Sequence, residues 1–212
     1  MAGNQQLQLL SQILAAMPEA NLQLPDPQLL NYYENLENRV YWIDTEIDNA
    51  ELELCGMIIR WNKEDRMLPI KERQPIKIFF NSVGGSLDIA ETLISVIRLS
   101  KTPIIGIALG MVASAASLIF LSCHRRIALK NAYFIFHQGS CENIGGNFNE
   151  IQAAMEDYRA QVEKMKQFYI DNTSYPEEVI KEKIKTDWYI RGDELIEHDI
   201  IHDWIEDITD LL

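Results

Sequence analysis

The sequence predicts an α/β domain built on a parallel sheet. Short apolar segments rich in β-branched residues alternate along the chain with segments whose apolar residues recur every three to four positions. Strand and helix patterns that alternate in this way are typical of parallel strands joined by right-handed crossovers. The longest uncharged run, residues 104–123, combines both patterns. With 212 residues, the chain is long enough for one well-packed domain.

The first 30 residues differ from the rest of the chain. Residues 1–24 are rich in Gln and Leu and suit a short amphipathic helix, which the following Pro25-Asp26-Pro27 would end. The segment has no basic n-region and makes a poor secretory signal, although a processed propeptide stays open. We expect residues 1–30 to form an N-terminal arm and residues 31–212 to form the main domain.

The first half of the main domain is predicted to contain two strands and two helices before the uncharged run. Residues 39–43 and 76–80 have the composition of strands. Residues 48–62 and 87–99 have apolar residues at helical spacing. The segment between them, residues 62–75, is charged and ends in proline, so we expect an exposed connection.

The uncharged run is predicted to be a buried strand followed by a buried helix. We expect the strand to break at Gly110 and the helix to begin at Met111, close to Ser114. The run meets the length rule for a membrane span. Its small residues, its strand-like first half and the lack of a second span to pack against favour a buried core segment instead.

The second half of the chain continues the alternation. Strands are predicted at 126–129 and 133–136, followed by a loop at 139–148. A long helix comes next, whose apolar residues recur by four and three over about five turns from Ile151 to Tyr169. This stripe suits packing on the chain's own sheet and contact with another subunit equally well. The remaining elements are predicted as a helix at 176–185, a strand at 188–190, a short helix at 193–197 and a strand at 200–205.

Composition excludes several classes of function. The chain has 32 acidic and 19 basic residues, and the net charge of −13 argues against nucleic-acid or anionic-membrane binding. The three cysteines have no CxxC spacing, which favours a reducing, cytoplasmic setting without disulfides. Neither nucleotide-binding glycine motif is present. His198 and His202 have helical metal spacing, but they lie in a predicted turn and strand without a third ligand, so we expect no metal.

Three residues lie where a predicted strand ends or a helix begins, which is where catalytic groups gather in open sheets. Each has a structural interpretation: Ser114 as a helix N-cap, His137 as a core histidine, and Asp187 as an exposed helix terminus. Together they would supply a nucleophile, a general base and an acid that orients the base. Gly84-Gly85, after another strand, would let backbone N–H groups approach a reacting carbonyl oxygen.

With these residues identified, the chain resembles the proteolytic subunit of Clp protease, the ClpP family, from about Tyr33 to Asp207. The resemblance implies a ClpP/crotonase-like fold, a repeated β-β-α superhelix with a protruding handle helix at about residues 139–171. It also makes residues 1–30 an axial segment. The matching motifs, the last of them weaker, are Asn81-Ser82-Val83-Gly84-Gly85-Ser86, Gly110-Met111-Val112-Ala113-Ser114, Phe136-His137-Gln138, Thr186-Asp187 and Tyr33-x-x-Leu36-x-x-Arg39-Val40.

The resemblance assigns roles to the candidate residues. It implies Ser114 as nucleophile, His137 as general base, Asp187 as its orienting partner, and the backbone N–H groups of Gly85 and Ala115 as an oxyanion hole. The chain would be a serine endopeptidase subunit of an ATP-dependent system. It would hydrolyse unfolded proteins and short peptides inside a homo-oligomeric chamber of two stacked seven-membered rings. A AAA+ unfoldase is the implied partner, and no cofactor is implied.

The sequence departs from the family pattern at four positions in the matched region. Val83 and Gly139 replace prolines, and Ala116 and Asp199 replace glycines. Because aspartate tolerates a left-handed backbone, we expect the turn at Asp199 to survive. The axial-loop pattern is not recognisable in the first 30 residues. Two alternatives stay open: a non-catalytic ring subunit that needs a catalytic paralogue, and a crotonase-like acyl-CoA enzyme without the triad.

Overall fold

The computed structural model of the protein describes residues 26–140 and 145–211. The chain divides into two compact units, residues 1–35 and 36–212. Helix α2 (Pro27–Glu37) begins in the first unit and ends in the second. The predicted N-terminal arm lies almost wholly outside the described residues. The second unit contains the sheet and every candidate site residue.

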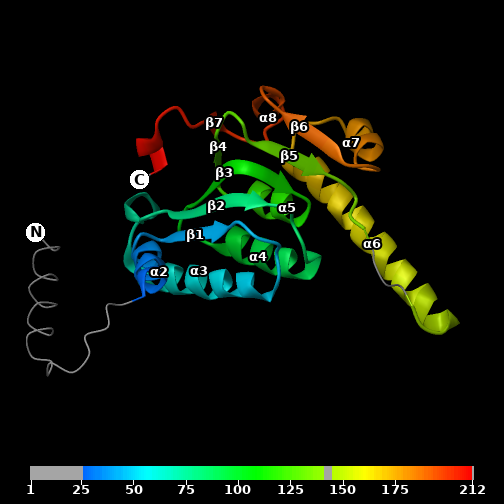
Figure 1. Cartoon of the computed structure of the whole chain (residues 1–212), viewed down its shortest axis with the longest axis horizontal. Helices are drawn as coiled ribbons and strands as arrows, with labels where there is room; N and C mark the ends of the chain where they lie inside the picture. Colours follow the sequence, from blue (N-terminus) through cyan, green and yellow to red (C-terminus); the bar gives the residue numbers. More distant parts are fainter. Residues whose placement is uncertain (1–25, 141–144, 212) are drawn as a thin grey trace, which may run out of the picture. The chain divides into compact units, whose positions relative to one another are not determined.

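The second unit is a mixed α/β fold (Figure 1). Its strands are β1 (Val40–Ile43), β2 (Ile76–Ser82), β3 (Ile104–Ala113), β4 (Arg125–Ala128), β5 (Tyr133–Phe136), β6 (Trp188–Arg191) and β7 (Asp203–Trp204). Its helices are α3 (Leu52–Glu64), α4 (Leu87–Leu99), α5 (Ala115–Leu121), α6 (Phe148–Asn172), α7 (Glu177–Lys183) and α8 (Glu194–Glu197). Short 3-10 turns occur at Asn49–Glu51, Asp65–Met67, Ile70–Glu72 and Ile208–Leu211.

The described strands form one sheet in the order β1-β2-β3-β4-β7, and neighbours on this path are parallel. Strand β5 pairs in parallel with the end of β3, and β6 pairs antiparallel with β5. The side chains of Ile78 and Phe80 on β2 belong to the main core with α3, α4 and α5, whereas Phe79 packs in a smaller cluster on the opposite face. The predicted α/β class with parallel pairing is confirmed, and β6 is the antiparallel exception.

Helix α4 has its predicted bounds, but the predicted strand break at Gly110 was wrong. Strand β3 continues past this glycine to Ala113. The ladder between β2 and β3 is irregular here, and the Asn81 side-chain oxygen accepts a hydrogen bond from the Met111 N–H at 3.2 Å. A Cβ on Gly110 would lie 2.5 Å from that oxygen. The glycine therefore permits the close approach of an asparagine instead of ending the strand.

The connection at 62–75 was expected to be exposed, yet Asp65 within it is only 3% exposed. Arg39 donates two hydrogen bonds to its carboxylate, at 2.6 and 2.9 Å, and the Thr102 hydroxyl donates a third at 2.7 Å. Arg39 also donates to the Gln74 carbonyl at 3.0 Å. Arg39, Gln74 and Thr102 precede β1, β2 and β3, so the buried pair of Asp65 and Arg39 joins the amino ends of three parallel strands.

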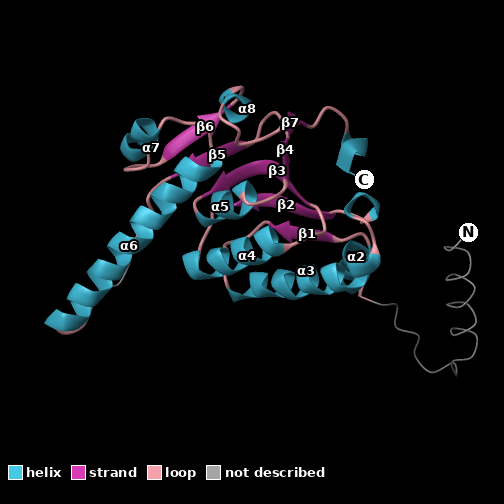
Figure 2. Ribbon diagram, turned by 180° about the vertical axis from the view of Figure 1, so that it is seen from behind, coloured by secondary structure: helices cyan, strands magenta, loops and turns pink. Residues whose placement is uncertain are grey.

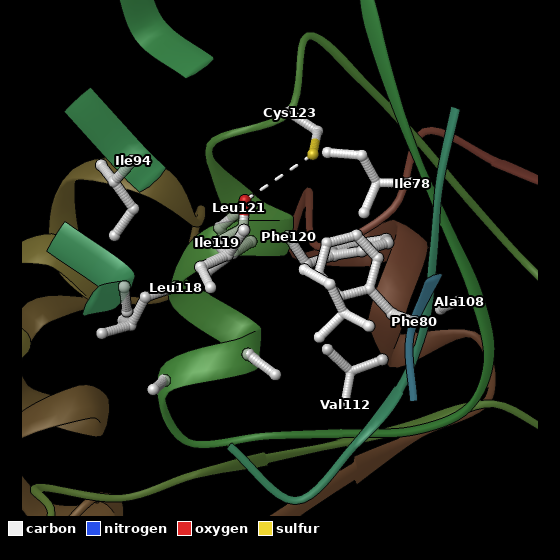
Figure 3. Packing of buried hydrophobic residues seen from close by; sticks show 14 of the residues in the cluster. Ile78, Phe80, Ile94, Ala108, Val112, Leu118, Ile119, Phe120, Leu121 and Cys123 are labelled. Atoms are coloured by element: carbon white, nitrogen blue, oxygen red, sulfur yellow. Dashed lines mark hydrogen bonds between the residues drawn. The ribbon is translucent and has the colours of Figure 1, made fainter. Parts of the chain in front are cut away.

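Helix α5 forms the centre of the core (Figure 3). All its residues are buried, and the Phe120 ring packs edge-on against Phe80 with the ring centroids 5.3 Å apart. Cys123 follows the helix, and its thiol donates to the Ile119 carbonyl at 3.6 Å. The uncharged run is thus a buried strand and a short buried helix, as expected, but the helix begins at Ala115 and not at Met111. None of the helices in the described part of the chain is long and apolar enough to cross a membrane.

Helix α6 is the long helix predicted from the apolar stripe, and Figure 2 shows it extending away from the sheet. Its C-terminal half packs on the sheet, where Met165 and Tyr169 are buried. In its N-terminal half, Phe148 is 78% exposed, and Ile151 and Met155 are each 39% exposed. The stripe therefore packs on the chain's own core at one end and leaves apolar side chains exposed at the other.

Candidate functional site

The fold brings the three candidate catalytic residues to one edge of the sheet. Ser114 directly follows β3 and His137 directly follows β5, which runs parallel to β3. Asp187 precedes β6, whose first residue pairs with the last residue of the antiparallel strand β5. As a result, the His137 Nδ1 and Asp187 Oδ1 atoms lie 3.6 Å apart although 49 residues separate them in the chain.

Ser114 occupies a strained backbone turn. Its φ of 51° and ψ of −127° are rare for a residue with a side chain, and such conformations cost about 1–3 kcal/mol. Its N–H donates to the Ile135 carbonyl at 3.0 Å, and its own carbonyl accepts from the Ser117 N–H at 2.9 Å. Ser114 does occupy the N-cap position of α5, but its hydroxyl makes no capping hydrogen bond. A sharp strand-to-helix turn of this kind exposes the hydroxyl of a serine placed on it.

The double glycine after β2 lies directly against this turn. Gly84 has a φ of +96°, and a Cβ added to it would lie 2.7 Å from both the Ala113 carbonyl oxygen and the Ser114 Cβ. Ile47 lies on the other side, where its N–H donates to the Gly84 carbonyl at 2.8 Å and a Cβ added to Gly85 would clash with the Ile47 carbonyl oxygen. Only glycine fits this approach, which brings the backbone of the turn beside the serine.

Ser114 and His137 share a pocket of about 300 Å³. Gly85 and Ala115, the residues expected to supply an oxyanion hole, also line it. This volume is at the lower end of the range found for ligand-binding pockets. The other lining residues are Ser86, Leu87, Asp88, Gln138, Gly139, Ser140, Tyr158, Gln161 and Met165.

The His137 ring is suited to accept a proton. Burial lowers its pKa below the ordinary value of 6.5, and the Asp187 carboxylate only partly opposes this effect. Its Nε2 atom is buried and makes no hydrogen bond with any described residue, so the ring nitrogen that would face a nucleophile is unoccupied. The 3.6 Å between Nδ1 and the Asp187 carboxylate oxygen is longer than a hydrogen bond, and the contact becomes an ion pair only when the ring is protonated. The three groups are together, but neither hydrogen bond of a closed triad is formed.

The segment after the histidine is held on both sides. The Gln138 N–H donates to the Ile184 carbonyl at 2.8 Å. Gly139, which has a φ of +82°, accepts a hydrogen bond at its carbonyl from the Tyr158 hydroxyl of α6 at 3.0 Å. Asp199, which replaces a glycine of the family pattern, has a φ of +57°. Its N–H donates to the Ile196 carbonyl, so the turn at this position is formed as expected.

Other reactive side chains have structural roles. The His202 Nδ1 accepts from the Arg126 N–H at 3.1 Å, and the His198 ring stacks on Tyr175 with the centroids 3.6 Å apart. Across residues 26–140 and 145–211, no three His, Cys, Asp or Glu side chains are placed to hold a metal ion. Burial raises the pKa of Cys123 to about 12 and also raises that of Cys55, which keeps both thiols protonated.

Sequence reasoning missed two tyrosines that act around the site. Tyr158 and Tyr169 were counted only as members of the apolar stripe on the long helix. In the structure, the Tyr158 hydroxyl holds the Gly139 carbonyl, and the Tyr169 hydroxyl lies 3.1 Å from the Ser117 hydroxyl. Both tyrosines lie on the side of α6 that carries the stripe. The hydroxyl groups of these tyrosines could have indicated a role in the site, because a buried tyrosine hydroxyl usually has a hydrogen-bond partner.

Comparisons with known proteins agree on one family. The model of the Clp protease family matches residues 63–207. The ATP-dependent Clp protease proteolytic subunit 2 of Treponema denticola is 28% identical over 137 residues, which cover 64% of this chain and 68% of that protein. Proteolytic subunit 1 of Streptomyces avermitilis is 23% identical over 179 residues, covering 83% and 79%. The structure of a ClpP1 mutant from Listeria monocytogenes has the same fold, with a TM-score of 0.70 at 22% identity over 86% of this chain and 99% of that one.

Proposed function

Because the chain belongs to the Clp protease family, we propose that it is a serine endopeptidase whose catalytic triad is Ser114, His137 and Asp187. One observation carries the proposal. The strained turn at Ser114 puts the serine in the same pocket as His137, whose Nδ1 faces Asp187 at 3.6 Å. A core serine and a core histidine would need neither the strain nor the shared pocket.

The proposed mechanism follows from this arrangement. The Ser114 hydroxyl attacks the peptide carbonyl while His137 Nε2 takes its proton, and Asp187 keeps the ring in the required tautomer. The N–H groups of Gly85 and Ala115 stabilise the negative oxygen of the tetrahedral intermediate. His137 then gives the proton to the leaving amine, and water hydrolyses the acyl-enzyme by the same steps. The free Nε2 and the 3.6 Å contact require the serine and the acid to move closer when substrate binds.

As the pH is lowered, the peptidase activity should fall to half its maximum at a pH below 6.5. A general base acts only when neutral, and burial lowers the pKa of His137, so the neutral form persists to lower pH than in a free histidine. The measurement is kcat/KM for a fluorogenic peptide between pH 4 and pH 9, which reports the ionisation of the free enzyme. A midpoint above 6.5, or a profile flat down to pH 4, would contradict the role of His137.

We also propose that the exposed half of α6 joins a second copy of this chain, as the handle between two stacked heptameric rings. The half-exposed Ile151 and Met155 support this, since their stripe continues the buried one at Met165 and Tyr169. Replacing Ile151 with aspartate should shift the native mass from the double ring towards the single ring. Ala160→Asp, an exposed change outside the stripe, is the control and should leave the mass unaltered. A monomeric wild-type chain in native mass spectrometry would refute the chamber.

The proposed substrates are unfolded proteins and short peptides, delivered in the cytoplasm by a AAA+ unfoldase. The relatives named above support the partner, because their names describe proteolytic subunits of ATP-dependent proteases. The test is hydrolysis of a short peptide by the purified chain, and then ATP-dependent degradation of an unfolded protein when an unfoldase is added. Hydrolysis only after mixing with a paralogue would instead identify a non-catalytic ring subunit. Turnover of an acyl-CoA without peptide hydrolysis would identify the crotonase-like alternative.

A further inference from the structure

Two buried hydroxyl groups lie behind the proposed nucleophile and base. Ser117 is on α5 and Tyr169 is on α6, and both residues are 0% exposed. The Ser117 hydroxyl donates to the Ser114 carbonyl oxygen at 2.6 Å and lies 3.1 Å from the Tyr169 hydroxyl. Neither residue lines the pocket, so neither would touch a substrate.

The direction of these hydrogen bonds follows from the number of hydrogens available. The Ser117 hydroxyl has one hydrogen and gives it to Ser114, so it must accept from Tyr169. The result is one ordered chain from the Tyr169 hydroxyl through the Ser117 hydroxyl to the Ser114 carbonyl oxygen. Hydrogen bonds in such a chain strengthen one another.

The tyrosine ring is fixed independently of its hydroxyl. It stacks on Phe136, the residue before His137, with the centroids 4.2 Å apart and the planes 19° apart. Burial raises the pKa of Tyr169 well above its usual range, so the hydroxyl keeps the proton that it donates to Ser117. Removing the hydroxyl alone would therefore break the chain and leave the ring in place.

We propose that Ser117 and Tyr169 are positioning residues, which hold the Ser114 turn in a fixed position relative to the end of β5 that precedes His137. The inference rests on the proposed catalytic roles of Ser114 and His137. A left-handed, strained serine persists only where its surroundings hold it, and the Ser117 hydroxyl is one such restraint. Because the Tyr169 ring stacks on Phe136, the same chain also ties the end of β5 to the start of the helix that follows Ser114.

The test is Tyr169→Phe. We expect kcat to fall about tenfold with KM unchanged, because one buried hydrogen bond is lost and no substrate contact is removed. The rate at which a fluorophosphonate labels Ser114 should fall in parallel. Ser117→Ala should have an effect of the same kind, and the double variant should be no worse than the more damaging single variant, since both interrupt one chain.

Matched controls separate positioning from general damage. Tyr175→Phe removes a buried tyrosine hydroxyl that donates to Glu194, and Ser122→Ala removes a hydroxyl that donates to Leu118 on the same helix as Ser117. Both should retain wild-type kcat. If Tyr169→Phe melts at a lower temperature than Tyr175→Phe, the kcat values of Ser117→Ala and Ser122→Ala are compared instead. A lower kcat in Ser117→Ala alone supports positioning, and equal kcat values contradict it.

Hydrogen exchange of the Ser117 amide, which donates to the Ser114 carbonyl at 2.9 Å, gives a readout that does not depend on activity. The amide should exchange faster in Tyr169→Phe than in wild type, and at the wild-type rate in Tyr175→Phe. Unchanged exchange together with unchanged kcat in Tyr169→Phe would overturn the inference. A wild-type chain that neither labels nor hydrolyses peptide would overturn the proposed function instead, and the exchange rates would still decide whether Tyr169 holds the Ser114 turn.

Discussion

Replacing Ser114 with alanine is expected to lower peptide hydrolysis by at least about 10³-fold, because the acyl-enzyme can no longer form. The fold should survive, since the side chain makes no capping hydrogen bond and the strained turn is held by backbone contacts to Ile135 and Ser117. Loss of the hydroxyl then removes the nucleophile alone. The measurement is kcat/KM on a short fluorogenic peptide, with the melting temperature and the native mass recorded for each variant.

The matched control for this change is Ser122→Ala. Ser122 is a buried serine at the end of the same short helix, and its hydroxyl bonds only to the preceding turn, at 3.0 Å from the Leu118 carbonyl oxygen. It should keep wild-type activity. Retained hydrolysis in Ser114→Ala would exclude this serine as the nucleophile, whatever the control shows.

Asp65→Asn is expected to destabilise the fold by about 3–5 kcal/mol, because it leaves the buried Arg39 guanidinium without its carboxylate. For a chain of this size, that corresponds to a fall in melting temperature of roughly 10 °C. The change lies at the amino ends of the parallel strands, opposite the edge that carries Ser114, so kcat of the folded protein should not change. Melting temperatures are compared at equal subunit concentration, because assembly also stabilises.

Glu64→Gln is the control, since Glu64 also faces Arg39, at 3.6 Å, but has a side chain 54% exposed. It should cost less than about 1 kcal/mol, as exposed ion pairs do. The pKa of Asp65 is held below its ordinary 3.8 chiefly by the hydrogen bonds from Arg39. The stabilisation is therefore complete above pH 3.8 and is lost as the pH falls below it. Equal effects of the two variants would contradict the account of the buried pair.

Many helices and strands could be predicted because their ends are marked by nearby residues in the sequence. Helix α4 and strand β5 are bounded as predicted because Ser86 and Thr102-Pro103 mark the ends of the helical segment, and the apolar run at 133–136 is short. Ser114 and His137 each follow a predicted strand, and parallel strands end at one edge of a sheet, so the sequence predicts that both residues lie at this edge. The pairing of β5 with β3, which makes them neighbours, comes from the structure.

Other features depend on contacts between distant segments, which no local pattern records. The sequence pattern predicts a strand end at Gly110, because it does not reveal the Asn81 side chain that packs against this glycine. It likewise predicts an exposed Asp65, because the partners of this carboxylate, Arg39 and Thr102, are 26 and 37 residues away. The hydroxyl of Tyr169 was hidden in an apolar stripe for the same reason. In each case a polar group is satisfied by tertiary structure alone.

Covalent labelling shows whether Ser114 is the nucleophile. The purified wild-type chain is incubated with a fluorophosphonate at pH 7.5, and the modified peptide is identified by mass spectrometry. We expect one adduct, on Ser114, and none in Ser114→Ala. An adduct on another serine, or no adduct on a correctly folded and assembled chain, would contradict the triad of Ser114, His137 and Asp187.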